Sequence, residues 1–374
     1  MERLMLIALR WSYRIIRPIL FLFDSEIIHV FFVRFGAGLA KTPGMRWFTE
    51  KLASNSIPSL VTTIAGITFP SPIGLGAGFD YEARLPEALP LFGFGFDTVG
   101  TITKGAYEGN RYPRLGRLIR SQSLVVNKGF KNLGIEATLE HLKHLHPIVP
   151  LGLSIGRTNT KTYTTHAEAI DDIVYSFKQA ESSSAHIAYY ELNVSCPNLS
   201  VPIEFYEPER LDELLKAVTD IGLWRPVFIK MPIDKDDATI HAMLDVIVKH
   251  PIAGIIIGNL RKDRSTVIPE ESDKYPRGGL SGVPCRDRSD ELIRLAHTQA
   301  GSTLAIIGCG GVFSAEDAYR KIRSGASLIQ LITGLIFNGP FLPREIALGL
   351  EKLLERDGFA NIADAVGADV RAHG

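Results

Sequence analysis

A cysteine stands at the end of an apolar run, in the stretch ELNVSCPNLS that covers residues 191 to 200. Free cysteines are commonly small buried residues, so Cys196 could be structural. A nucleophile would need a nearby histidine, and no histidine stands at a predicted strand end. A general base needs only reach and a suitable pKa, and because a free thiol titrates near ~8.5, its thiolate is accessible near neutral pH. We therefore predict that Cys196 is a general base.

A lysine and four asparagines also stand at or near predicted strand ends. Lys230 closes the run VFIKM, and an unpaired buried ammonium is costly. It could lie beside an electron-rich cofactor ring, such as a reduced flavin, or pair with an acid on a neighbouring strand; we favour the cofactor. A single asparagine is often a turn residue, but a set of amides on one rim suits a flat, amide-rich heterocycle. The four amides are Asn127, Asn193, Asn198 and Asn259.

Glycines follow the last two predicted strands, as Gly310-Gly311 and as Thr333-Gly334. Glycine lets backbone N–H groups approach an anion, and a helix beginning near Ser314 would add its positive N-terminal end. In barrel enzymes these two loops form a frequent phosphate site. A tight turn is the alternative for each, but the two together favour a phosphorylated cofactor or substrate.

These positions need a fold that brings strand ends together. From about residue 60, short apolar runs alternate with helical patterns, which indicates parallel strands joined by crossover helices. About eight such units predict an α/β fold, the (β/α)8 TIM barrel; an open doubly wound sheet is less favoured because no early G-x-G-x-x-G is present. The expected strands are 72–77, 96–101, 149–155, 187–194, 226–230, 253–257, 303–308 and 327–332. The expected helices are 82–90, 135–144, 167–181, 208–221, 236–249, 286–299, 315–324 and 342–354.

The polar stretch 259–285 lies between the sixth strand and its helix and is punctuated by Gly and Pro. A loop of that length in a compact domain is usually functional or mobile. It would lie on the face where barrel enzymes keep their active sites.

Composition excludes several classes of protein. The 374 residues are 45% hydrophobic and 22% charged, so a sizeable core can form. The formal net charge of +0 gives no support to a nucleic-acid partner. The 3 cysteines form neither a disulfide framework nor a metal motif, so a reducing compartment is expected and no metal is predicted.

The first 40 residues are apolar yet carry arginines that a helix would place on one face. The arginines interrupt the apolar run short of the ~20 residues that span a bilayer, so a basic amphipathic helix lying on a membrane is favoured over a spanning helix. Packing of this segment on the protein's own core is the alternative. The arginines are Arg3, Arg10, Arg14 and Arg17.

A second N-terminal helix is expected over about 26–35, capped by Asp24 or Ser25. We therefore divide the chain into an amphipathic membrane segment at 1–45 and a barrel domain at 46–374. The expected location is peripheral, on the cytoplasmic side of the cell membrane.

Several motifs resemble those of the FMN-dependent dihydroorotate dehydrogenases. They are NVSCPN, FIKMP, GGLSG, IIGCGG and LIQLITGLIFNGP. The stretch RPILFLFDSEIIHVFFVRFGAGL, with PIGLGAGFD, VGTIT and NKGFKNLG after it, is similar to the membrane-associated, quinone-reducing branch, class 2. The resemblance runs in order from about residue 14 to 350.

This resemblance implies an FMN barrel whose N-terminal helices form a quinone tunnel at the membrane. It implies oxidation of dihydroorotate to orotate in pyrimidine (UMP) biosynthesis, with a base removing the C5 proton and the C6 hydride passing to the flavin. Because the chain has the N-terminal helices, quinone is the expected acceptor and no iron–sulfur partner subunit is expected.

The family's residues carry over position by position, and Cys196 takes the position of the base. The implied cofactor-binding residues are Ala77, Gly78, Tyr81, Thr101, Ser154, Asn193, Lys230, Gly258, Gly282, Gly311, Ile332 and Thr333. The implied substrate-binding residues are Asn127, Lys128, Gly129, Phe130, Asn193, Asn198 and Asn259.

The chain also departs from the quinone branch. Cys196 stands where that branch has serine and matches the soluble class 1 branches, and Ser154 replaces an FMN-binding asparagine. Gly258 and Leu260 replace threonines, and the substrate loop is one residue shorter.

Tyr81 replaces a lysine that contacts flavin and orotate in the family. Lys128 or Lys131 in the shortened loop could supply the missing cation. Two other functions therefore stay open: oxidation of a different dihydropyrimidine, such as dihydrouracil, and a flavin-binding barrel that has lost orotate activity.

Overall fold

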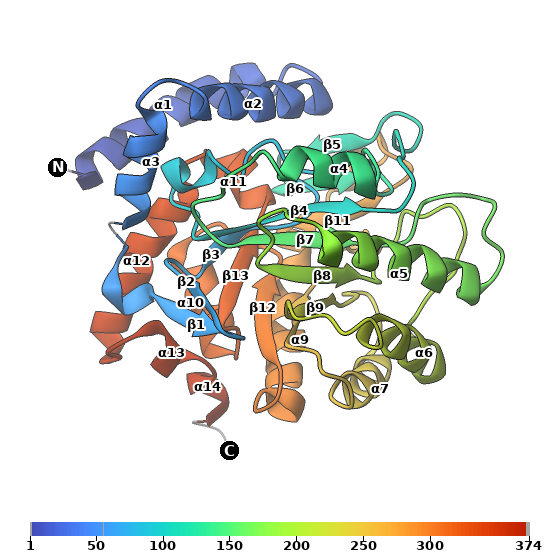
Figure 1. Cartoon of the computed structure of the whole chain (residues 1–374). Helices are drawn as coiled ribbons and strands as arrows, with labels where there is room; N and C mark the ends of the chain where they lie inside the picture. Colours follow the sequence, from blue (N-terminus) through green and yellow to red (C-terminus); the bar gives the residue numbers. More distant parts are fainter. Residues whose placement is uncertain (1, 55, 372–374) are drawn as a thin grey trace.

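The computed structural model describes residues 2–54 and 56–371 and contains a closed barrel of eight parallel strands (Figure 1). Each barrel strand pairs with the next one along the chain, and β13 closes on β3. The predicted (β/α)8 barrel is confirmed, with all eight expected strands present. They are β3 (Ile73–Leu75), β4 (Phe96–Ile102), β7 (Leu151–Ile155), β8 (Tyr189–Asn193), β9 (Val227–Lys230), β10 (Gly254–Ile257), β12 (Ala305–Cys309) and β13 (Leu328–Leu331).

Helices follow the barrel strands, and the longer ones bury an apolar stripe. In α6 the stripe is Leu211, Leu214, Leu215 and Val218, which is the spacing of one helix face. The helices are α4 (Ile135–Leu142), α5 (His166–Ser182), α6 (Pro208–Thr219), α7 (Asp237–Ile247), α9 (Arg286–Ala300), α10 (Ala315–Arg323), α11 (Thr333–Asn338), α12 (Leu342–Asp357), α13 (Ile362–Ala365) and α14 (Ala368–Arg371).

The prediction of a helix over 82–90 is wrong. The segment is a turn followed by the short 3-10 helix η2 (Leu89–Phe92). Pro86 disfavours helical backbone at the residue before it. The Asp80 carboxylate accepts hydrogen bonds from the backbone N–H groups of Arg84 and Leu85, at 2.9 and 2.7 Å, and so holds the turn.

An aromatic layer fills the end of the barrel where the strands begin, and the hairpin of β1 (Thr62–Ile64) and β2 (Ile67–Phe69) packs against it. Phe69, Phe96 and Tyr189 are fully buried in this layer. A Cβ at Gly152 would lie 2.2 Å from the Tyr189 ring, so glycine on the strand makes room for the ring. This end is therefore solid core.

A small antiparallel sheet lies beside the other end and was not anticipated as a sheet. Its strands are β5 (Leu115–Leu118), β6 (Ser123–Val126) and β11 (Gly279–Gly282), in the order β11-β6-β5. The stretch 259–285, expected as a loop, contains β11, the short helix α8 (Pro269–Ser272) and the 3-10 turn η3 (Val283–Cys285). The sheet lies between the barrel and the N-terminal helices in Figure 1.

The N-terminal helices are α1 (Glu2–Leu20), α2 (Ser25–Ala40) and α3 (Met45–Ser54), and they lie at one end of the barrel (Figure 1). Asp24 caps α2, as predicted, by accepting from the backbone N–H groups of Glu26 and Ile27. No helix in the described part of the chain is long and apolar enough to cross a membrane.

The helix α1 turns part of its basic face inward. Arg10 pairs with Glu345 at 3.2 Å, and Arg17 donates to the carbonyl of Phe337 at 2.8 Å. Part of the segment thus packs on the protein, as the alternative interpretation held, while large apolar side chains of α1 and α2 stay exposed. These are Ile7, Trp11, Ile15, Ile16, Ile19, Ile27, Phe31 and Phe35, with Leu22 and Phe23 between the two helices. The side chain of Arg3 lies outside the described residues.

Candidate active site

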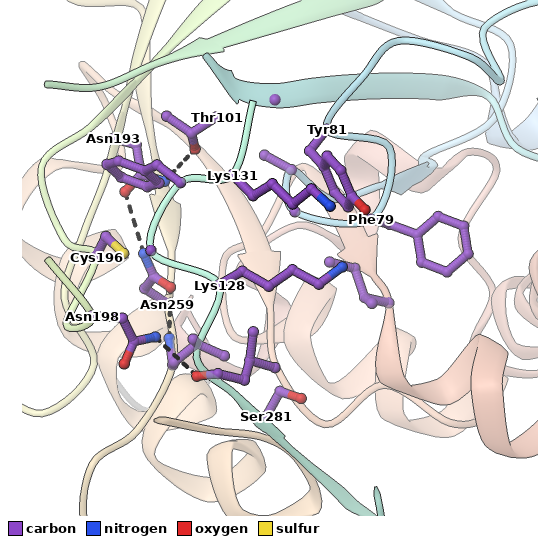
Figure 2. Close-up of a pocket in the computed structure, with 18 of the residues that line it drawn as sticks. Phe79, Tyr81, Thr101, Lys128, Lys131, Asn193, Cys196, Asn198, Asn259 and Ser281 are labelled. Atoms are coloured by element: carbon purple, nitrogen blue, oxygen red, sulfur yellow. Dashed lines mark hydrogen bonds between the residues drawn. The ribbon is translucent and has the colours of Figure 1, made fainter. Parts of the chain in front are cut away.

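A cavity of about 880 Å³, here named the inner cavity, opens where the barrel strands end (Figure 2). The sequence-predicted residues that line it are Ala77, Gly78, Tyr81, Thr101, Lys128, Gly129, Phe130, Asn193, Cys196, Asn198, Lys230, Asn259 and Ile332.

A chain of hydrogen bonds orients the amides of this cavity. Asn193 Nδ2 donates to Thr101 Oγ1 at 2.8 Å, and Asn259 Nδ2 donates to Asn193 Oδ1 at 3.3 Å (Figure 2). Thr101 Oγ1 lies 2.8 Å from Ser154 Oγ, which donates to Glu191 Oε1 at 2.6 Å. Ser154 therefore does not line the cavity but supports the residues that do.

Lys230 has the neighbouring-strand acid that was its alternative role. Its Nζ lies 3.4 Å from Glu191 Oε2, and both side chains are buried inside the barrel. Lys230 also lines the inner cavity, so its ion pair and a role beside a ligand are compatible. A buried ammonium needs such a partner, because its desolvation is otherwise uncompensated.

Cys196 lies in the loop after β8 with its side chain on the inner cavity (Figure 2). Burial raises the pKa of its thiol to about 11, although the backbone N–H of Asn198 and the positive charges of Arg157, Lys230 and Lys262 oppose the shift. The prediction of a thiolate accessible near neutral pH is therefore wrong for this structure. A base at this position acts from a small thiolate fraction that grows with pH.

Tyr81 is packed among cations and an imidazole. Lys128 Nζ lies 4.3 Å from the centre of the Tyr81 ring and Lys131 Nζ lies 5.5 Å from it, while the His29 ring stacks on it at 5.6 Å. Lys131 also lies 3.8 Å from Glu26 Oε1.

Lys128 differs from Lys131 because its side-chain ammonium forms no hydrogen bond or ion pair with any described residue, and its contact is with the Tyr81 ring. Its side chain is only 8% exposed, and burial lowers its pKa to about 8. Of the two lysines proposed to replace the missing cation, Lys128 is the one that lines the inner cavity without an acidic partner.

The outer wall of the inner cavity is made of amides. Asn110 Nδ2 donates to Asn127 Oδ1 at 2.9 Å and to the carbonyl of Asn198 at 3.0 Å. Asn198 Nδ2 donates to the carbonyl of Val126 at 2.9 Å (Figure 2). Asn127 thus lies in this wall and not on the inner cavity.

The predicted phosphate turns lie outside the inner cavity lining. Ser281 Oγ lies 2.7 Å from Thr333 Oγ1, and a Cβ at Gly282 would lie 2.9 Å from Thr333 Cγ2. The end of β11 therefore lies directly against the turn after β13. Gly311 has φ +70°, and a Cβ there would lie 2.4 Å from Arg286 Cβ. Of the predicted cofactor residues, Ser154, Gly258, Gly282, Gly311 and Thr333 do not line the inner cavity.

A second cavity of about 1030 Å³, here named the apolar cavity, lies between α1, α2 and the barrel. Its lining residues include Tyr13, Phe21, Ile28 and Phe32 from the N-terminal segment. Among the described lining residues Arg117 is the only arginine, and none is Lys, Asp or Glu. Five residues line both cavities and so separate or connect them: His29, Phe79, Leu115, Leu124 and Ile336.

Burial lowers the pKa of His29 to about 3, so this shared side chain is neutral at physiological pH. Its Nε2 lies 2.8 Å from the carbonyl of Phe79. His29, Glu191 and Asn110 were missed by the sequence analysis. For His29 a signal existed: it lies in the expected helix over about 26–35, between Ile28 and Phe32, which also line the apolar cavity.

The fold and cavity together define a barrel enzyme whose site can hold a flat, amide-rich ring. A family model described as dihydroorotate dehydrogenase matches residues 59–354. The chain belongs to the dihydroorotate dehydrogenase family, whose members are flavin-dependent oxidoreductases.

Named relatives cover nearly the whole chain. A dihydroorotate dehydrogenase (quinone) of Natronomonas pharaonis is 36% identical over 358 residues, which are 96% of this chain and 99% of that protein. One of Synechocystis sp. is 36% identical over 329 residues, covering 86% of this chain and 85% of that one. A crystal structure of DHODH from Eimeria tenella in complex with ferulenol has a TM-score of 0.81 at 26% identity and covers 93% of this chain and 96% of that chain.

Proposed function

We propose that this protein oxidises dihydroorotate to orotate on bound FMN and passes the electrons to quinone, as a step of pyrimidine (UMP) biosynthesis. The observation that carries the proposal is the composition of the inner cavity. One cavity holds a thiol, three hydrogen-bonded asparagine amides and the ammonium of the buried Lys230–Glu191 ion pair, and it adjoins an apolar cavity.

The described residues fit FMN. Gly78 has φ +108° with open space where a Cβ would be, so the backbone offers a bare surface to a ring. Thr101, Asn193 and Lys230 present polar groups on the same cavity, and the Gly282, Gly311 and Thr333 turns suit a phosphate. When bound, FMN supplies the two-electron acceptor for the substrate hydride.

The chain's own groups handle the substrate and its proton. Asn193, Asn198 and Asn259 offer donors and acceptors to the amide edges of a pyrimidine ring. Lys128 offers its ammonium to the substrate carboxylate. Cys196 Sγ, as thiolate, takes the proton from C5 while the hydride leaves C6, so orotate forms by loss of both.

The buried acid behind Lys230 has a role in the same scheme. Glu191 holds the Lys230 ammonium at the cavity and accepts from Ser154, so the positive charge is fixed before any ligand binds. A fixed charge stabilises developing negative charge without reorganisation.

The second reactant is proposed to use the other cavity. Quinone is apolar, and the apolar cavity leads from α1 and α2 toward the inner cavity. The exposed apolar side chains of α1 and α2 support peripheral association with the cytoplasmic side of the cell membrane, where quinone is dissolved. No iron–sulfur partner subunit is needed in this scheme.

The test is anaerobic bleaching of the flavin. The full chain is purified in detergent, its visible spectrum is recorded, and dihydroorotate is added without oxygen. The proposal predicts a yellow protein that dihydroorotate bleaches and quinone recolours. If dihydrouracil bleaches the yellow protein and dihydroorotate does not, the substrate is a different dihydropyrimidine. If neither compound bleaches it, the protein is a flavin-binding barrel without this activity.

A further inference from the structure

A wide polar opening, here named the basic mouth, lies on the outer side of the amide wall. Its lining comes from six separate segments of the chain and contains no Asp or Glu among the described residues. Five cations line it: Arg111, Lys161, Lys262, Arg264 and Arg277. Because the net charge of the chain is +0, this local excess is not a consequence of a basic protein.

One of the five cations has a structural task. The Arg264 guanidinium donates to the carbonyls of Ser272, Tyr275 and Gly278, at 3.2, 2.6 and 3.0 Å, and so shapes the loop before β11.

The other four cations are available to a ligand. Their side-chain nitrogens form no hydrogen bond or ion pair with residues in the described part of the chain, and all four residues are exposed. They are Arg111, Lys161, Lys262 and Arg277.

Two acids close to the mouth are already engaged. Asp263 pairs with Arg261 and accepts from the backbone N–H of Ser265, and Asp234 accepts from the backbone N–H of Lys262. The four free cations thus face an opening whose described lining supplies no opposite charge.

The basic mouth and the inner cavity share a wall. Asn198 lines both, and Asn127 lines the mouth with Asn110, so these three hydrogen-bonded amides separate the two spaces. A molecule collected in the mouth thus lies one side chain away from the amides that would bind a pyrimidine.

We propose that the basic mouth is the access route of the anionic substrate, where cations attract a small carboxylate and pass it across the amide wall. This inference rests on the proposed function, and it adds where the substrate enters and why. The apolar cavity is a poor route for the same molecule, because a carboxylate there would lose its hydration with little to replace it.

The experiment reverses charge in the mouth and follows each half-reaction by stopped flow. The triple variant Arg111→Glu, Lys161→Glu and Arg277→Glu changes none of the residues assigned to the cofactor or the proton. The matched control reverses three exposed cations on the outer helical layer: Lys178→Glu, Lys249→Glu and Arg294→Glu. Both carry the same total charge, so only its place differs.

The measured quantity is the second-order rate constant for flavin reduction by dihydroorotate at low and high salt. We expect the triple mouth variant to lose about tenfold or more at low salt and to lose the salt dependence, while the control keeps both. Bound-flavin absorbance and reoxidation by a neutral quinone should be normal in both variants, which shows that they are folded.

Equal rate constants in the two variants at every salt concentration would overturn the basic mouth as the access route. If the unmodified protein is not bleached by dihydroorotate at all, the proposed function fails instead, and the two failures are distinguishable.

Discussion

The inner cavity has two neighbours of opposite chemistry. The apolar cavity is built from α1, α2 and the barrel, with a neutral His29 and a single arginine among its described lining residues. The basic mouth is built from loops and carries five cations and no acid among the residues described there. Both meet the inner cavity through a thin wall, of apolar residues on one side and of amides on the other.

This difference explains how two reactants of opposite chemistry can reach one cavity from different sides. A carboxylate is attracted by the mouth and excluded by apolar walls, whereas a quinone gains by leaving water for the apolar cavity. Variants on one side should therefore alter one half-reaction and spare the other.

The largest effect is expected at the shared centre. Cys196→Ala should slow flavin reduction by dihydroorotate about 10²–10⁴-fold, because the proton acceptor is lost. Bound flavin and reoxidation by quinone should stay normal. Cys309→Ala is the matched control, since that thiol does not line the inner cavity. Reduction of Cys196→Ala at the normal rate would end the base assignment.

Deletion of residues 1–40 should abolish quinone turnover, with at least a ~100-fold loss, and spare flavin reduction by dihydroorotate, since it removes α1 and α2 from the apolar cavity. A point variant guards against misfolding. Ile28→Trp would fill the apolar cavity and raise the KM for quinone, whereas Ile27→Trp on the exposed side should not. Unchanged quinone turnover in the truncated protein would refute this cavity as the quinone route.

Lys128→Met should raise the KM for dihydroorotate about 10–100-fold, because a charge-assisted hydrogen bond is worth about 1.5–3 kcal/mol. The quinone half-reaction should not change. Lys131→Met is the comparison: that ammonium already lies 3.8 Å from Glu26, so a smaller effect is expected. If Lys131→Met has the larger effect, the cation has been assigned to the wrong residue.

The pH dependence should also separate the two half-reactions. The thiolate is the active form of Cys196 and its pKa is about 11, so flavin reduction at saturating dihydroorotate should rise about tenfold per pH unit from pH 6 to 9. Above pH 8 the KM should rise as Lys128 loses its charge. Reoxidation by quinone should stay flat, because His29 is neutral above about pH 3. A flat profile for flavin reduction would contradict the thiolate.

The barrel was predictable because its strands read as short apolar runs between long helical patterns, a signal that survives in one sequence. The small sheet was not, because β5, β6 and β11 are only four residues each, and β5 and β11 contain Gly. The false helix at 82–90 came from ignoring Pro86, which lies where a helix would have to continue.

The residue types of the site were predictable, but their ion pairing and pKa values were not. Strand ends placed Asn193, Lys230 and Cys196 on one cavity. The acid that pairs with Lys230 and the burial that raises the Cys196 pKa depend on packing between distant segments, which residue spacing does not encode. The cluster of mouth cations was not predictable, because its members come from four segments of the chain that only the fold brings together.

The separation of the two access routes is tested most directly by salt. The unmodified protein is reduced by dihydroorotate and, in a separate experiment, reoxidised by a neutral quinone, each at ionic strengths from about 0.01 to 0.3 M. The Debye length is ~30 Å at the lowest of these ionic strengths and much shorter at the highest, so charge attraction is screened across the series. The account predicts that the second-order rate constant for dihydroorotate falls about tenfold while that for quinone changes less than about twofold. Equal salt dependence of the two half-reactions, or none in either, would contradict it.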